Sequence, residues 1–241
     1  MTQISIIFDI DDTLYDQVFP IVSACEETFG LKLEDPMRFY LTFRKRSNEW
    51  FFRAEQGEVS LGDSRINRIR QTMEDLSVSI SEEQAEHFQT MYEEKTLQLH
   101  MSDRLTAFMG RCTLENVRMG ILTNGPHEHQ MKKYYTLGLN RWISPNMILI
   151  SQSAGYAKPD VRIFRMAERK MGLIPEMTWM VGDSLSNDIA GAVKAGWHSL
   201  WLARHSAAED RISGLTPDET AYSEEELCAI LEDKIKEAKS L

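Results

Sequence analysis

Two aspartates two positions apart, Asp9 and Asp11, directly follow an isoleucine-rich apolar run at residues 4–8. The run predicts a buried strand. Alternate residues of an extended chain point the same way, so both carboxylates can face one ligand. Two ionised carboxylates at this spacing repel each other, and they need a cation, a shared proton or different roles. An acidic turn capped by Thr13 would explain the same residues without any chemistry.

A second and a third group of polar residues follow later apolar runs. Thr123, Asn124 and Gly125 offer a hydroxyl, an amide and a flexible backbone, which together suit the oxygens of a phosphate group. Lys158 stands just before Pro159, where a helix start and an ammonium would both favour an anion. A capped turn and a solvated lysine are the alternatives without chemistry.

A fourth group, Gly182-Asp183-Ser184, follows another apolar run and is itself followed by Asn187 and Asp188. The carboxylate of Asp183 is expected at the tip of a strand. Oxygen ligands of this kind suit a hard cation such as magnesium. Capping of a helix by the serine or asparagine side chains is the alternative explanation.

The elements that must position these groups follow from the hydrophobic pattern. Strands are expected at residues 4–8, 117–122, 147–151, 178–181 and 199–202. Helices are expected after the second strand up to residue 138, and at 160–171 and 187–195. Alternating strands and helices predict an α/β fold, a doubly wound parallel sheet of the Rossmann-like kind. Because ligands of such sheets bind at the carboxyl ends of the strands, the four polar groups should share one edge.

A helical insert separates the first strand from the rest of this pattern. Four helices are expected, at 18–29, 36–55, 61–76 and 82–99, with Gly30 as a C-cap and with Ser60 and Ser81 as N-caps. We therefore expect residues 1–16 and 100–241 to form the core domain and residues 17–99 to form a second, helical domain. The last segment, 223–241, is expected to be a charged helix.

Composition excludes several classes of protein. The 241 residues carry a net charge of −10 without a basic run of nucleic-acid-binding length, so a nucleic acid polymer is not an expected partner. Three widely spaced cysteines favour neither a disulfide framework nor a zinc site, which fits a reduced, cytoplasmic protein. We see no signal peptide and no apolar run long enough for a membrane helix. The sequence indicates no oligomeric state.

These residues resemble a known family. The segments FDIDDTL (8–14), LTNG (122–125), KPD (158–160) and VGDS (181–184), the last followed by Asp188, are similar to the four motifs of the haloacid dehalogenase-like hydrolase superfamily. The order of the motifs matches, and the insert looks like the helical cap domain of that family. The layout is similar to the phosphoglycolate phosphatase and pyrimidine 5′-nucleotidase branches.

The resemblance implies a magnesium-dependent phosphatase that works through an aspartyl-phosphate. Asp9 would be the nucleophile and would bind Mg²⁺ through its carboxylate. Asp11 would be the general acid and base, with its backbone carbonyl on the metal, and Asp183 would be the third metal ligand. Asp188 would support this site. Phosphoryl transfer needs positioning and charge neutralisation above all, which agrees with this set of groups.

The resemblance also assigns the phosphate-binding residues. Thr123 and Lys158 would hold the phosphoryl oxygens, and Asn124 and Gly125 would add substrate contacts through the backbone of their turn. The expected substrate is a small phosphorylated metabolite, and a nucleoside monophosphate is favoured.

Four other classes of protein share part of this pattern. A phosphomutase would keep both aspartates. A carbon–halogen hydrolase needs the nucleophile but no acid two residues later, so Asp11 argues against it. A receiver-like signalling domain carries its phosphorylated aspartate after the third strand, where this chain has Ser151-Gln152-Ser153. A dinucleotide oxidoreductase would show GxGxxG after the first strand, which is missing.

Substrate specificity is expected from the insert. A basic run (44–46) could steer an anionic ester, and an aromatic run (50–52) could stack a base, unless both simply form the surface and the core of the insert. His127 and His129 could touch substrate, although a helix start at the surface also explains them. Residues 15–16 could act as a hinge or gate.

Overall fold

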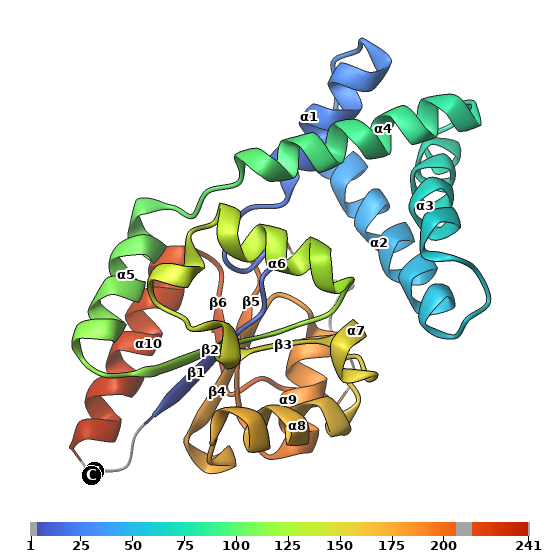
Figure 1. The fold of residues 1–241 in the computed structure, drawn as a ribbon. Coiled ribbons are helices and arrows are strands. Elements are labelled where there is room, and N and C mark those ends of the chain that lie inside the picture. Colours follow the sequence, from blue (N-terminus) through green and yellow to red (C-terminus); the bar gives the residue numbers. More distant parts are fainter. Residues whose placement is uncertain (1–3, 206–213, 241) are drawn as a thin grey trace. The chain divides into compact units, whose positions relative to one another are not determined.

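The computed structural model of the chain describes residues 4–205 and 214–240. In these residues six parallel strands form one sheet in the order β3-β2-β1-β4-β5-β6 (Figure 1). The strands are β1 (Ser5–Phe8), β2 (Arg118–Thr123), β3 (Ile148–Ile150), β4 (Thr178–Gly182), β5 (His198–Leu202) and β6 (Glu219–Ala221). The predicted α/β fold with a doubly wound parallel sheet is confirmed.

Helices occupy most of the remaining described chain. The α-helices are α1 (Val18–Phe29), α2 (Pro36–Glu55), α3 (Leu61–Asp75), α4 (Glu82–Lys95), α5 (Asp103–Leu114), α6 (His127–Thr136), α7 (Ser151–Ala154), α8 (Val161–Met171), α9 (Ala190–Ala195) and α10 (Glu224–Lys239). Short 3₁₀ turns lie at Thr96–Gln98, Leu139–Arg141, Pro145–Met147 and Pro175–Met177, and one π-helical turn lies at Leu185–Ile189. None of the described helices is long and apolar enough to cross a lipid bilayer.

Strand register explains why distant residues meet at one edge. β1 lies between β2 and β4, with Phe8 opposite Ile121 on one side and Val181 on the other. All the strands run the same way, so the residues just after β1, β2 and β4 emerge together. The residue after β1, Asp9, continues the ladder for one step, because its N–H donates to the carbonyl of Val181 at 2.9 Å.

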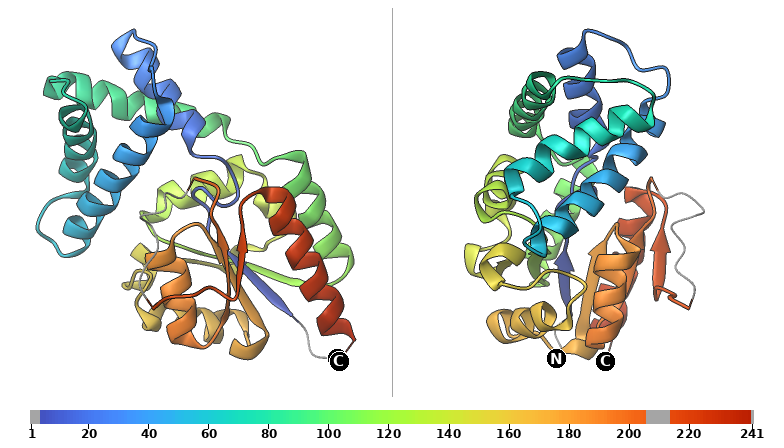
Figure 2. Two further views of the ribbon diagram at one scale, coloured as in Figure 1. Left: turned by 180° about the vertical axis from the view of Figure 1, so that it is seen from behind. Right: turned by 90° about the vertical axis from the view of Figure 1, so that its right-hand side faces the viewer.

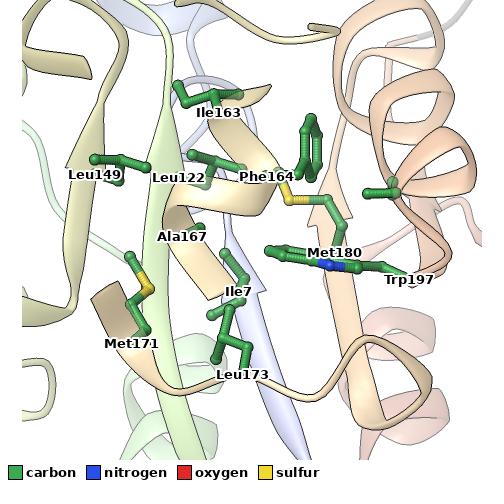
Figure 3. Packing of buried hydrophobic residues seen from close by; sticks show 12 residues of the cluster. Ile7, Leu122, Leu149, Ile163, Phe164, Ala167, Met171, Leu173, Met180 and Trp197 are labelled. Atoms are coloured by element: carbon green, nitrogen blue, oxygen red, sulfur yellow. The ribbon is translucent and has the colours of Figure 1, made fainter. Parts of the chain in front are cut away.

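One face of the sheet is covered by α8 and α9 (Figures 1 and 2). Figure 3 shows how Ile7, Leu122 and Met180 from three strands pack against Phe164 of α8 and against Trp197. The Phe164 and Trp197 rings meet edge to face at a centroid distance of 5.2 Å. This dry layer anchors the start of α8, which is the helix that follows Lys158. On the other side of the sheet, α5 and α10 lie next to each other (Figure 1).

The chain divides into two compact units, Met1–Asp16 with His100–Leu241, and Gln17–Leu99. The second unit has an aromatic core of its own, in which Phe43 contacts both Phe88 and Tyr92 edge to face. Its helices begin at caps that the sequence predicts: Ser60 accepts from the N–H of Asp63, and Ser81 forms a complete capping box with Gln84. We propose that this unit is the cap domain of the protein.

Several elements differ from the sequence-based expectation. The helix expected at 187–195 begins as a π-helical turn at Leu185–Ile189, and the strand expected at 147–151 ends at Ile150, where α7 follows. The helix expected at 82–99 ends at Lys95 and continues only as a 3₁₀ turn, and α5 was not expected although Ser102 caps it by accepting from the N–H of Leu105. The short edge strand β6 was also missed. It is anchored by long-range bonds, because Asp218 accepts from both the N–H and the hydroxyl of Ser199 at 2.8 Å.

Candidate active site

The side chain of Asp9 lies at the carboxyl end of β1 and is 6 % exposed. One of its carboxylate oxygens accepts a hydrogen bond from the Lys158 ammonium at 2.7 Å. The same ammonium donates to Asp188 at 2.5 Å and to the carbonyl of Leu122 at 2.9 Å. All three donors of this buried lysine are therefore engaged, and its position is set by groups from β1, β2 and the turn after β4.

The loop that carries Lys158 is fastened to the turn after β2. The Asn124 side chain donates to the carbonyl of Lys158 at 3.0 Å and accepts from its N–H at 2.8 Å. This two-way bond uses both ends of the amide. Asn124 therefore acts here through its side chain, on the loop, whereas the predicted contact to substrate concerns the backbone of its turn and stays a prediction.

Asp188 is placed by the π-helical turn at Leu185–Ile189. Its side chain is 1 % exposed. The carboxylate bonds Lys158 and accepts a hydrogen bond from the N–H of Ser184 at 3.0 Å. The carboxylate lies directly against the backbone of Gly182, where a Cβ atom would overlap it. The glycine in the fourth motif thus has a packing reason, which is the close approach of Asp188.

We predict that Gly182→Ala displaces Asp188 and disturbs Lys158 with it. Overpacking of this kind costs about 1–3 kcal/mol of unfolding free energy. A misplaced catalytic group can cost about 10²-fold in kcat. Thermal unfolding and steady-state kinetics would measure both. Gly110→Ala in α5 is the matched control, since nothing lies within 4 Å of the added methyl group; equal effects of the two substitutions would contradict the packing argument.

Three carboxylates gather beside Lys158. Asp9, Asp183 and Asp188 each offer an oxygen, and these oxygens all lie within 4.8 Å of one another. Asp183 is 8 % exposed. The Lys158 ammonium bonds two of these buried acidic groups, Asp9 and Asp188, and Asp183 adds a third carboxylate beside them, an arrangement that suits a further positive charge. The donor set consists of carboxylate oxygens alone, so it fits a hard divalent cation such as Mg²⁺.

Burial and neighbouring charge shift the pKa values in this cluster. Burial raises the pKa of Asp9 to about 6, with Lys158 opposing the rise and the charges of Asp188 and Asp11 adding to it. Burial works to lower the pKa of Lys158, but the two carboxylates that it bonds raise it above its ordinary value. The lysine is therefore a fixed cation, able to stabilise negative charge on a substrate.

Asp11 lies with a different set of partners. Lys133 of α6 donates to its Oδ1 at 2.5 Å, Gln130 donates to its Oδ2 at 2.9 Å, and the Tyr15 hydroxyl also donates to Oδ1. Burial raises the pKa of this carboxyl, but the Lys133 charge and the three hydrogen bonds together lower it to about 2. Asp11 is thus an anion here, and a metal contact through its backbone carbonyl rests on the family resemblance.

The last residue of β2 carries a buried hydroxyl. Thr123 is 1 % exposed, and its Oγ1 has no hydrogen-bond partner among the described residues. Buried hydroxyls are bonded as a rule, so this one is suited to a group that is bound during function. Gly125 is also a predicted substrate-binding residue, and its N–H donates to the Ser151 hydroxyl at 2.9 Å. A substrate contact of Gly125 stays a prediction.

The remaining sequence candidates lie around this edge. His127 is exposed and its Nδ1 bonds the Ser153 hydroxyl at 2.7 Å. Tyr15 contacts Asp11, and Asp16 contacts His205 with an Nε2 to Oδ1 distance of 3.1 Å.

Sequence reasoning missed Gln130 and Lys133. They stand three residues apart in the helix after Thr123 and so share one face of it. Nothing in the sequence distinguishes Lys133 from the exposed Lys132 beside it, so only the structure shows this contact.

The family pattern of haloacid dehalogenase-like hydrolases matches residues 5–196. The chain belongs to this family. The matched range includes Asp9, Lys158 and Asp183, which the structure brings together at one edge of the sheet.

Relatives of this hydrolase include phosphatases and dehalogenases. It is 38 % identical over 104 residues to phosphoserine phosphatase of Thermus thermophilus, covering 43 % of this chain and 41 % of that protein. Identity is 33 % over 118 residues to pyrimidine 5′-nucleotidase YjjG of Escherichia coli, covering 48 % and 50 %. Identity is 25 % over 209 residues to (S)-2-haloacid dehalogenase of Pseudomonas putida, covering 86 % and 87 %. The chain thus matches half or less of each phosphatase.

Solved structures share the fold of this hydrolase. YfnB of Bacillus subtilis, a HAD-hydrolase bound to magnesium, superposes with a TM-score of 0.72 at 21 % identity, covering 96 % of this chain and 100 % of that one. The L-2-haloacid dehalogenase RSc1362 superposes with a TM-score of 0.76 at 16 % identity, with the same coverage. At these identities the likeness establishes the fold.

Proposed function

We propose that this hydrolase is a magnesium-dependent phosphatase that cleaves a small phosphomonoester through an aspartyl-phosphate on Asp9. The observation that carries the proposal is the pair of acidic sites at one strand end. Asp9 belongs to a three-carboxylate cluster that fits a divalent cation, and Asp11 is held apart from it by donors. Phosphoryl transfer needs both a neutralising cation and an acid–base group.

The roles follow from the contacts. The carboxylates of Asp9 and Asp183, with the backbone carbonyl of Asp11, would hold Mg²⁺, which when bound neutralises charge on the transferring phosphoryl group. Lys158 and the Thr123 hydroxyl would bind phosphoryl oxygens and stabilise charge in the transition state. Asp188 positions Lys158 through their 2.5 Å ion pair.

The chemistry takes two steps. First an Asp9 oxygen attacks phosphorus in line with the ester oxygen, and the ester P–O bond breaks. The leaving alkoxide takes a proton from Asp11, which must first be protonated in the complex with the anionic ester, because its donors favour the carboxylate in the free protein. A water then attacks phosphorus and gives a proton to Asp11. The bond between phosphorus and Asp9 breaks, and inorganic phosphate leaves. The reaction is thus divided into two displacements at phosphorus, and in each of them the attacking and the leaving oxygen can lie in line within the same site.

Carbon–halogen hydrolysis is the second candidate, because an (S)-2-haloacid dehalogenase aligns with 86 % of the chain. The nucleophile alone would serve that reaction. The clustered carboxylates and the clamped Asp11 would have no task in it, which favours the phosphatase. A phosphomutase would use the same groups but would protect its phosphoenzyme from water.

A nucleoside monophosphate is the substrate we favour, and the likeness to a pyrimidine 5′-nucleotidase supports it. In the helical unit, Trp50 is part of the packed interior, since it is 7 % exposed and its indole N–H donates to the Gln71 side chain. Phe52 is 63 % exposed and stays the aromatic candidate for contact with a base. In the basic run, Arg46 is bound to Asp75 and Glu49.

The proposal predicts phosphate release that depends on Mg²⁺. We expect the enzyme with Mg²⁺ to release phosphate from nucleoside monophosphates, sugar phosphates or phosphoglycolate, and EDTA to abolish the release until Mg²⁺ is restored. Malachite green detection measures phosphate, and ion chromatography measures halide from 2-chloropropionate in parallel. Halide release without phosphate release would establish the dehalogenase instead. Retained phosphate with rearranged ester would establish the mutase.

A further inference from the structure

The α6 helix grips the Asp11 carboxylate from one side. Lys133 and Gln130 each take one oxygen, at 2.5 Å and 2.9 Å, and both side chains are buried, with 4 % and 3 % of their surface exposed. Their spacing of three residues places them on one face of the helix. The two contacts fix both the position and the rotation of the carboxylate plane, which one contact alone would not do.

The same grip ties Asp11 to the phosphate-binding turn. Gln130 also donates to the carbonyl of Asn124 at 2.6 Å, which is the residue after Thr123. One amide thus bridges Asp11 and the turn after β2. Any movement of α6 would shift Asp11 relative to that turn, so the helix sets the distance between the acid–base group and the bound phosphoryl group.

Stability gives little reason for a buried lysine at this place. Removing an ammonium from water is costly, and a buried ion pair often contributes no more than an apolar pair of the same size. Lys133 is also a donor only, and Gln130 points its donor end at Asp11. The Tyr15 hydroxyl also donates to Oδ1, so all three of these contacts treat the carboxylate as an acceptor, which is the role of a base.

We propose that Lys133 and Gln130 are positioning residues that hold Asp11 as the base for the second step, hydrolysis of the aspartyl-phosphate. This inference rests on the proposed phosphatase function. In that step the water oxygen bonds to phosphorus, its proton moves to Asp11, and the bond from phosphorus to the Asp9 oxygen breaks. The first step depends less on Lys133 and Gln130 when the leaving group needs no proton.

The test uses p-nitrophenyl phosphate, whose leaving group departs as an anion. We expect Lys133→Met, studied with Mg²⁺ by stopped-flow absorbance, to release a burst of about one equivalent of p-nitrophenolate. A steady state about 10²-fold slower than wild type should follow, since positioned acid–base groups contribute about 10²–10⁴-fold. KM should fall together with kcat, so that kcat/KM stays close to the wild-type value, because only the second step is slowed. Acid quench should trap the accumulated phosphoenzyme. Lys132→Met, an exposed neighbour on the same helix, is the matched control and should keep wild-type kinetics.

Gln130→Met is a second variant that tests the proposal if Lys133→Met does not fold. It replaces a neutral side chain with another of similar size. It should show the same burst and the same trapped phosphoenzyme. A folded variant that is slower without a burst, or that keeps wild-type kcat, would overturn the assignment while leaving the phosphatase in place. A wild-type chain that turns over no phosphoester at all would overturn both proposals.

Discussion

Asp9→Asn should abolish phosphatase activity, with kcat/KM falling by at least about 10⁴-fold, as expected when a covalent nucleophile is removed. The substituted amide keeps the shape of the side chain beside Lys158, so the protein should still fold. Only the attacking oxygen is lost, since an amide cannot form the phosphoenzyme. Steady-state phosphate release and acid-quench trapping of the phosphoenzyme measure the effect.

Asp233→Asn on α10 is the control for this substitution. It lies on an exposed part of the helix and bonds only a neighbouring lysine of that helix, Lys236, among the contacts described. It should leave both activity and trapped phosphoenzyme unchanged. Phosphate release by Asp9→Asn at more than a few per cent of the wild-type rate would remove Asp9 from its role as nucleophile.

Lys158→Met should have the largest effect on stability. The substitution leaves Asp9 and Asp188 buried and facing each other without their shared ammonium. Removing one partner of a buried ion pair costs about 3–5 kcal/mol of unfolding free energy. For a chain of this length, that corresponds to a fall in Tm of about 10 °C. Activity should fall as well, because a phosphoryl-binding cation is lost.

A double variant separates the two effects. Lys158→Met with Asp188→Asn removes one of the stranded carboxylates, so we expect part of the lost stability to return while activity does not. Differential scanning calorimetry in EDTA and phosphate release in Mg²⁺ measure the two quantities. Lys132→Met should stay within about 0.5 kcal/mol of wild type, as surface substitutions do. An unchanged Tm in Lys158→Met would show that the ion pairs of Lys158 do not stabilise the folded protein.

Much of the architecture could be predicted because local hydrophobic patterns and capping residues determine it. The α1 and α2 helices begin and end where the hydrophobic pattern and the caps place them, with Gly30 in the left-handed conformation at the end of α1. The order of apolar strands and polar ends also predicted that Asp9 and Asp183 would share an edge. Parallel strands have their carboxyl ends on one side, so no further information was needed.

The unpredicted elements lack such local signals or owe their stability to distant contacts. β6 has three residues and depends on Ser199 and Asp218, which bond across 19 positions of the chain. The π-helical turn carries Asp188, whose carboxylate lies against Gly182 and bonds Lys158. A helix pattern alone predicts an ordinary α-helix at that place.

The sequence by itself determined which residues gather at the edge of the sheet: the nucleophile candidate, the hydroxyl and the cation ligands stand at or just after strand ends, and the lysine stands in the loop before α8. Only the tertiary structure decided what each side chain contacts. Asp11 meets Lys133 across 122 positions, and neither residue's neighbours in the chain announce the pair. A strand end is set by local periodicity, but a partner is set by how α6 packs, which depends on the whole domain.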